Sequence, residues 1–177
     1  MAANSSKFNG VELSSIEKMI EDGVVFESSS KIQVASGGGV GKWLVRTGSK
    51  KVKILARQII SNGNEMDYQV TGGVTVSSAG TPAIVNNRNK PDAQEPTVKV
   101  FHSPTASGGT AISPVYMPGS ASQGQNVNGQ FSQDGDIRIL EPNTDYTAEV
   151  VNNGDVTPAN VELYIMWAEL TEPYPKS

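Results

Sequence analysis

The sequence predicts an all-β protein, an antiparallel β-sandwich of jelly-roll-like type with one short N-terminal helix. About ten short runs of β-branched and apolar residues alternate with turns rich in Gly, Asn and Asp, a pattern typical of sandwiches and barrels. The sequence also lacks the crossover helices that a parallel sheet requires. Its 177 residues suffice for one domain with its own core. We expect an arm with a short helix over 1–30 and a sandwich over 31–177.

The helix is predicted over residues 15–22. Ser14 and Glu17 have the spacing of a capping box, in which each side chain bonds the other residue's backbone N–H. Ile16, Met19 and Ile20 then share one face, and Gly23 is a suitable stop because glycine enters the left-handed conformation without steric cost. A helix this short is unstable alone. Its apolar face must therefore dock on its own domain or on a neighbour.

The strands are predicted from apolar alternation. Val161, Leu163, Ile165 and Trp167 give the clearest case, since they alternate with Glu162, Tyr164, Met166 and Ala168; we expect the first four to face the core with Tyr146 and Val150. Two long polar connections, 77–96 and 117–136, are candidates for loops or arms. The predicted strands are 24–27, 31–35, 42–46, 51–60, 67–71, 74–78, 97–102, 111–117, 136–140, 145–151 and 161–170.

The stretch "VASGGGVGKWLV" (34–45) resembles a phosphate-binding loop at first sight. Gly41 and Lys42 fit that pattern, but Ser36 replaces its first glycine and Trp43 replaces the hydroxyl residue that holds magnesium. A strand follows the loop, whereas a phosphate site needs a helix N-terminus there. The stretch is therefore interpreted as a turn between two strands, and no cofactor is expected.

Composition excludes several classes of protein. There is no cysteine, so no disulfide framework or thiolate metal site is possible. No apolar run approaches 18 residues, and the N-terminus lacks the pattern of a secretory signal. We therefore expect no membrane partner.

Charge is distributed unevenly. The net charge is −4, with +4 in residues 1–90 and −8 in residues 91–177, and residues 42–57 carry six basic residues and no acid. Nucleic acid is not the expected partner, because this stretch has a single aromatic residue and the whole chain is acidic. In a regular strand, one face would carry Lys51, Lys53 and Arg57. The opposite face, which we predict to be the core side, would carry Val52, Ile54 and Ala56. The cations can balance an acidic partner or the chain's own acidic C-terminal half.

No catalytic or metal-binding set is evident. His102 is the only histidine and has no G-x-S-x-G nearby, so we interpret it as a strand-end residue facing water. Asp134 and Asp136 could bind calcium, but they lack the spacing of an EF-hand and are interpreted as part of a turn. Trp43, Trp167 and Tyr146 could line a sugar-binding face, although aromatic residues on alternating strands usually fill the core.

The second half contains an ordered series of motifs. Residues 100–119 include His-x-Pro-Thr and a Gly-Thr turn; residues 136–170 include Glu-Pro-Asn-Thr-x-Tyr, Asn-Asn-Gly and Trp-Ala-Glu; "NNRN" lies at 86–89. Over roughly residues 12–170, this pattern resembles the small β-sandwich proteins encoded beside the major capsid protein of many tailed bacteriophages, the capsid decoration or cement proteins. The resemblance implies a non-enzymatic virion protein on the capsid exterior, made in the host cytoplasm. Its implied partners are the major capsid protein and further copies of itself, as a dimer or trimer.

The predicted capsid contact comprises the N-terminal arm, through Ile16, Met19 and Ile20, and the basic stretch at Lys50, Lys51 and Lys53. Two alternatives remain open. A carbohydrate-binding module or a tail-associated adhesion protein would be a sandwich with exposed aromatic residues. A hydrolase would need a partner for His102, and none is apparent.

Overall fold

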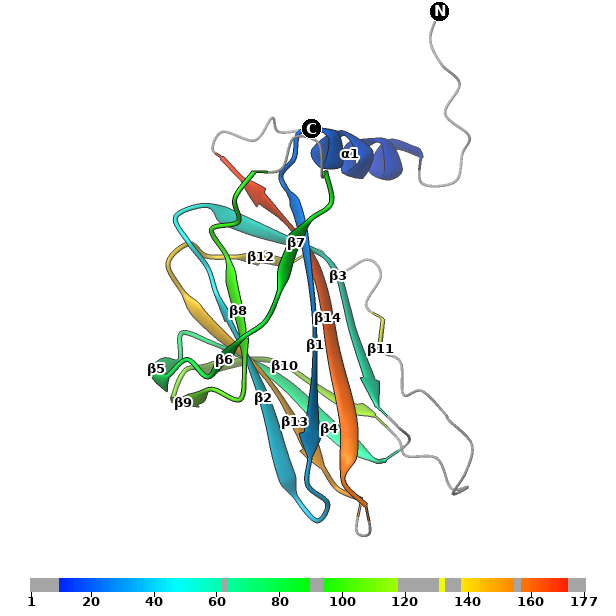
Figure 1. Ribbon diagram of the computed structural model, residues 1–177, viewed down its shortest axis with the longest axis vertical. Coiled ribbons are helices and arrows are strands. Elements are labelled where there is room, and N and C mark those ends of the chain that lie inside the picture. Colours follow the sequence, from blue (N-terminus) through cyan, green and yellow to red (C-terminus); the bar gives the residue numbers. More distant parts are fainter. Residues whose placement is uncertain are drawn as a thin grey trace, which may run out of the picture.

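The protein is an antiparallel β-sandwich with one helix across its end (Figure 1). The computed structural model describes residues 10–61, 64–89, 94–117, 131–132, 138–154 and 157–171, with side chains given except at 10–15, 113–117, 131–132 and 138. The all-β prediction is confirmed, while the jelly-roll connectivity stays a prediction. Most strand neighbours are distant in sequence, so the sandwich forms only when the two halves of the chain come together.

Two large sheets and one small sheet are present in the described residues. The first large sheet has the order β11 (Phe131–Ser132), β3 (Lys51–Ser61), β14 (Ala159–Leu170), β1 (Val25–Val34) and β7 (Val85–Asn87), and β12 (Arg138–Leu140) also pairs with β3. The second has the order β10 (Thr110–Met117), β4 (Met66–Gly72), β13 (Asp145–Asn152), β2 (Gly39–Arg46), β8 (Lys99–His102) and β6 (Thr81–Pro82). The small sheet pairs β5 (Thr75–Ser78) with β9 (Thr105–Ser107).

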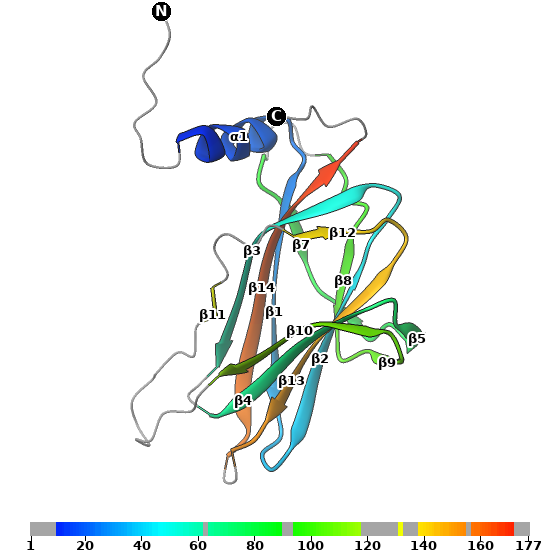
Figure 2. The same cartoon turned by 180° about the vertical axis from the view of Figure 1, so that it is seen from behind.

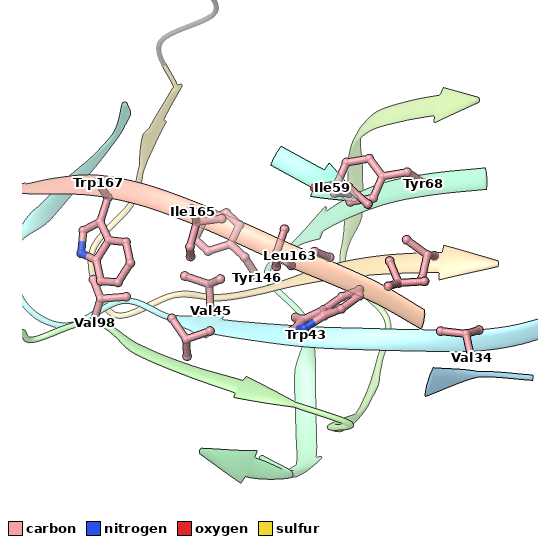
Figure 3. Packing of buried hydrophobic residues seen from close by; sticks show 14 of the residues in the cluster. Val34, Trp43, Val45, Ile59, Tyr68, Val98, Tyr146, Leu163, Ile165 and Trp167 are labelled. Atoms are coloured by element: carbon pink, nitrogen blue, oxygen red, sulfur yellow. The ribbon is translucent and has the colours of Figure 1, made fainter. Parts of the chain in front are cut away.

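The core lies between the two large sheets, as Figure 3 shows. Val161, Leu163, Ile165 and Trp167 are buried in one cluster with Tyr146 and Val150, which confirms the predicted alternation. The indole of Trp167 stacks on Phe26 with ring centroids 6.0 Å apart. Burial of these apolar faces drives the association of the sheets.

Helix α1 (Gly10–Glu21) is longer than predicted. It begins five residues before Ser15, so Ser14 lies within the helix and the capping-box prediction is wrong. The residues Val11 to Leu13 extend it, and Glu12 and Leu13 are good helix formers. The predicted stop is confirmed: Gly23 has φ 70°, its N–H bonds Ile20 O, and the N–H of Val24 bonds Met19 O. These two bonds form a Schellman cap.

Strand β1 spans two strands that the sequence predicts separately. Ser28 and Ser30 lie between the apolar runs but face the core side, where they are buried. Ser28 Oγ donates to Ile84 O at 2.8 Å, which satisfies the hydroxyl. The position expected for the boundary, residue 30, therefore falls inside a continuous strand, Val25–Val34.

A β-bulge in β3 changes which face of the sheet part of the basic stretch occupies, so that part of the prediction is wrong. Met166 pairs with Ala56 and Trp167 with Ile54, so Leu55 has no residue opposite it. An extra residue reverses which face the following side chains occupy. Val52 and Ile54 face the core as predicted, but Arg57 pairs with Ile165 and also faces inward. Arg57 therefore does not share a face with Lys51 and Lys53.

Candidate functional site

The apolar face of α1 docks on the sandwich of its own chain. Met19 is 4% exposed and packs in a cluster with Val25 and Ala168, and Ile16 and Ile20 are partly buried at its margin. Figures 1 and 2 show α1 lying across the end of the sandwich where β1 begins and β14 ends. The alternative left open by the sequence is thus resolved for Met19, whose side chain is covered by its own domain and not exposed for a partner.

The "NNRN" segment holds the end of this helix in place. Asn87 Nδ2 donates to Gly23 O at 2.7 Å, and Asn89 Nδ2 donates to Glu21 O at 2.7 Å. Gln94 Nε2 donates to Asp22 O at 2.9 Å. The last carbonyls of a helix have no intrahelical partner, so three amide side chains satisfy them here. These bonds fix α1 relative to β7.

The predicted contact residues of the arm and of the basic stretch lie at the same end of the molecule. Lys51 pairs across the sheet with Leu170, and Lys53 pairs with Ala168; both partners belong to the cluster under α1. Lys50 immediately precedes β3. The ion pairs among the described residues do not include Lys50 or Lys53. The strand pairing therefore places Lys51 and Lys53 beside the cluster that α1 covers, with Lys50 just before them; we call α1 together with these three lysines the helix end.

Two other basic residues of the stretch are paired internally. Lys42 Nζ lies 2.6 Å from Glu149 Oε2, and Arg46 bonds both carboxylate oxygens of Asp145 at 2.7 and 2.9 Å. The hydrogen bonds to Asp145 raise the pKa of the Arg46 guanidinium above its ordinary value. The acidic C-terminal half thus balances part of the basic stretch, which was the second interpretation of its charge.

The glycine-rich turn has no free donors for a phosphate at its centre. The N–H of Gly37 donates to Gly154 O, and the N–H of Gly38 donates to Asn152 O, both at 2.8 Å. Both glycines have positive φ. The segment joins β1 to β2 as a turn, in agreement with the interpretation from the sequence.

The catalytic and sugar-binding candidates are not assembled into a site. His102 Nδ1 lies 3.4 Å from its neighbour Ser103 Oγ, and no carboxylate among the described residues completes a catalytic set. Trp43, Trp167 and Tyr146 are buried in the core, so they do not form a sugar-binding face. Groups of His, Asp and Glu suited to a metal ion are absent from the described part of the chain, and Asp134 and Asp136 lie outside it.

An apolar cavity of about 420 Å³ opens between the sheets beside β3 and β4. Ile54, Leu163 and Ile165 line it, and Arg57 reaches it because of the bulge at Leu55. The guanidinium carbon of Arg57 lies 5.1 Å from the centroid of the Tyr68 ring, within the range of a cation–π interaction. The sequence did not predict this feature, because the bulge decides that the Arg57 side chain faces inward.

The motifs behind the resemblance build the scaffold. In Glu-Pro-Asn-Thr-x-Tyr, the Glu141 N–H donates to Tyr146 Oη at 2.9 Å, and Thr47 Oγ1 donates to Glu141 O and accepts from the Thr144 N–H. In Asn-Asn-Gly, the buried Asn152 bonds Val34 O and the Gly154 N–H. These residues fix corners and turns, so they carry information about the fold and not about a binding site.

The described residues contain no helix that is long and apolar enough to cross a membrane. Comparison of the chain with protein-family models and with curated protein sequences gave no match.

Proposed function

We propose that this chain is a structural virion protein, a capsid decoration or cement protein that binds the outside of a tailed-phage shell and stabilises it. The major capsid protein is its proposed partner, and its proposed role is binding and not catalysis. A protein that binds the assembled lattice better than the loose subunits stabilises the lattice by mass action.

The observation that supports this proposal most is the helix end. Two segments that are 30 residues apart in sequence, α1 and the start of β3, form one surface on a rigid sandwich. Ile16 and Ile20 are partly exposed there, and Lys50 and Lys53 stand beside them without an ion pair among the described residues. Partly exposed apolar side chains with charged residues beside them suit a surface that binds another protein.

The test is co-sedimentation of the purified chain with empty phage shells that lack it. We expect the wild-type chain to sediment with the shells and Lys53→Glu to bind them more weakly, and the double variant Lys51→Glu/Lys53→Glu to lose binding further. Lys31→Glu is the control, because Lys31 is also a lysine on a strand of the first sheet; it is exposed, whereas Lys53 is half-buried, and it lies roughly 20 Å along β1 from Val25. Wild-type chain that stays in the supernatant, or equal losses for Lys53→Glu and Lys31→Glu, would count against the proposal.

Deletion of residues 1–22 would not isolate the contact made by α1. It would uncover Val25 and Ala168, which Met19 now covers, and would therefore destabilise the sandwich as well as remove the contact. Charge reversal of Lys53 alone avoids this, since Lys53 makes no ion pair among the described residues and surface substitutions away from such contacts usually change stability by about 0.5 kcal/mol or less.

A further inference from the structure

Strands β5 and β9 form a two-stranded ribbon that continues the pairing of β4 with β10. Thr110 pairs with Gly72 in the large sheet, and Ser107 pairs with Thr75 just beyond it. The ladder bends at Gly73 and at Gly108 and Gly109, all with positive φ. Figures 1 and 2 both show the ribbon projecting to the side of the second sheet.

The bend is built into the backbone. A Cβ at Gly109 would lie 2.7 Å from Gly72 O, and at its φ of 86° other residues are strained. Only glycine allows the two strands to approach this closely while they turn. The direction of the ribbon is therefore fixed by the sequence.

The strands along this ribbon differ in how well their open edges are protected against pairing with another chain. Strand β10 has a bulge between Ala111 and Ser113, and Pro114 lacks an N–H donor. Strand β5 has a bulge between Val76 and Ser78. Bulges and prolines on edge strands prevent pairing with other chains. Strand β9 has neither, and within the described part of the chain its one partner is β5.

The two chain segments that form the ribbon are also uncharged. Residues 68–87 and 100–133 contain no Lys, Arg, Asp or Glu, and Thr105 and Ser107 are exposed. Charged side chains are the usual protection of an open edge, and lysine is the commonest of them. The whole chain carries a net charge of −4, so two copies repel each other where their acidic surfaces meet. They can approach most easily through an uncharged segment, which favours a second copy as the partner.

We propose that β9 is a self-association edge. Strand β9 of one copy pairs antiparallel with β9 of a second copy about a twofold axis at Ala106, so that Thr105 of each copy lies opposite Ser107 of the other. The product is a continuous four-stranded sheet in the order β5, β9, β9, β5. An edge strand is self-complementary in this arrangement, since the two copies exchange the same N–H and C=O groups. The contact is short, so the dimer dissociates on dilution.

A single-cysteine experiment tests the position of the axis. The chain has no cysteine, so Ala106→Cys introduces the one thiol present. Residues directly opposite on antiparallel strands have Cα atoms about 4.5–5.5 Å apart, which is within disulfide range. Mild oxidation should give a covalent dimer of Ala106→Cys, whereas Ala35→Cys, on the exposed turn between β1 and β2, should give no covalent dimer. Equal cross-linking of both variants would overturn the assignment.

A second experiment does not depend on covalent chemistry. Light scattering of the wild-type chain over a range of concentrations should show a monomer–dimer equilibrium. Ser107→Lys should raise the dissociation constant by about tenfold or more, and Gln33→Lys, which adds the same charge to an exposed position of β1, should leave it unchanged. Wild-type chain that is monomeric at millimolar concentration, or a dimer equally weakened by both substitutions, would overturn the proposal.

Discussion

The carboxylate of Glu169 accepts the backbone N–H of Thr97 with both oxygens, at 2.9 and 3.0 Å. It also accepts Thr97 Oγ1 at 2.7 Å and the N–H of Val98 at 2.9 Å. Glu169 is 1% exposed, so this buried charge is compensated by donors of the segment that leads into β8. One acidic residue at the end of β14 thus joins the first sheet to the second.

We expect Glu169→Ala to lower the free energy of unfolding by about 3 kcal/mol, because it leaves the buried N–H of Val98 and the part-buried N–H of Thr97 without their acceptor. Urea denaturation followed by tryptophan fluorescence measures this change. Glu17→Ala, at an exposed helix position, is the control and should change stability little. Equal midpoints for the two variants would show that water replaces the carboxylate at no cost.

Trp167→Ala should cost roughly 3–5 kcal/mol, the range for removal of a large buried aromatic residue. Trp167 is fully buried and stacks on Phe26, so the substitution leaves a cavity at the centre of the core. Thermal unfolding gives the measurement. A variant as stable as the wild type would mean that Trp167 is not packed as described.

Asn87→Ala should loosen α1 without unfolding the sandwich. The substitution removes the bonds from Asn87 Nδ2 to Gly23 O and to Gln94 O, so the helix detaches more often. Hydrogen exchange should become faster over residues 10–24 and stay unchanged in β14. Asn86→Ala, at the adjacent exposed position of β7, provides the control. Faster exchange throughout the chain would instead indicate global destabilisation.

Reversal of Lys42 or Arg46 should reduce stability, in contrast to reversal of Lys53. Lys42→Glu and Arg46→Glu each place two carboxylates together, against Glu149 and Asp145 respectively. Lys53→Glu breaks no ion pair among the described residues. Thermal melting of the three variants distinguishes the internal cations from those at the helix end, and a loss of stability at Lys53 equal to that at Arg46 would remove this distinction.

Stability should fall at alkaline pH in part through Tyr164. Burial raises the pKa of Tyr164 above its ordinary value of 10.0, and its hydrogen bond to Glu27 raises it further. Tyr164 therefore stays protonated to a higher pH in the folded chain than in the unfolded chain. The resulting stability is present below about pH 10 and is lost as the pH rises through the folded-state pKa. Urea midpoints at about pH 9 and about pH 11 should differ less for Tyr164→Phe than for the wild type, and an identical decline would contradict the assignment.

The sequence by itself determined the all-β class, the core face of β14 and the stop of the helix at Gly23. These features are local, because apolar alternation and the conformational freedom of glycine act within a few residues. Turn chemistry likewise identified the glycine-rich segment before β2 as a turn. The start of α1 was missed because helix propensity extends it beyond the apparent cap at Ser14.

Only the tertiary structure decided how these pieces are arranged. The bulge at Leu55 turns Arg57 inward, and it is defined by the pairing of β3 with β14, residues separated by more than a hundred positions. The partners of Asn87, Glu169 and Arg46 are also distant in sequence. A single sequence shows which residues can donate, accept or carry charge, but the partner of each is selected by strand order and register. For that reason the helix end and the open edge of β9 became visible only in the folded chain.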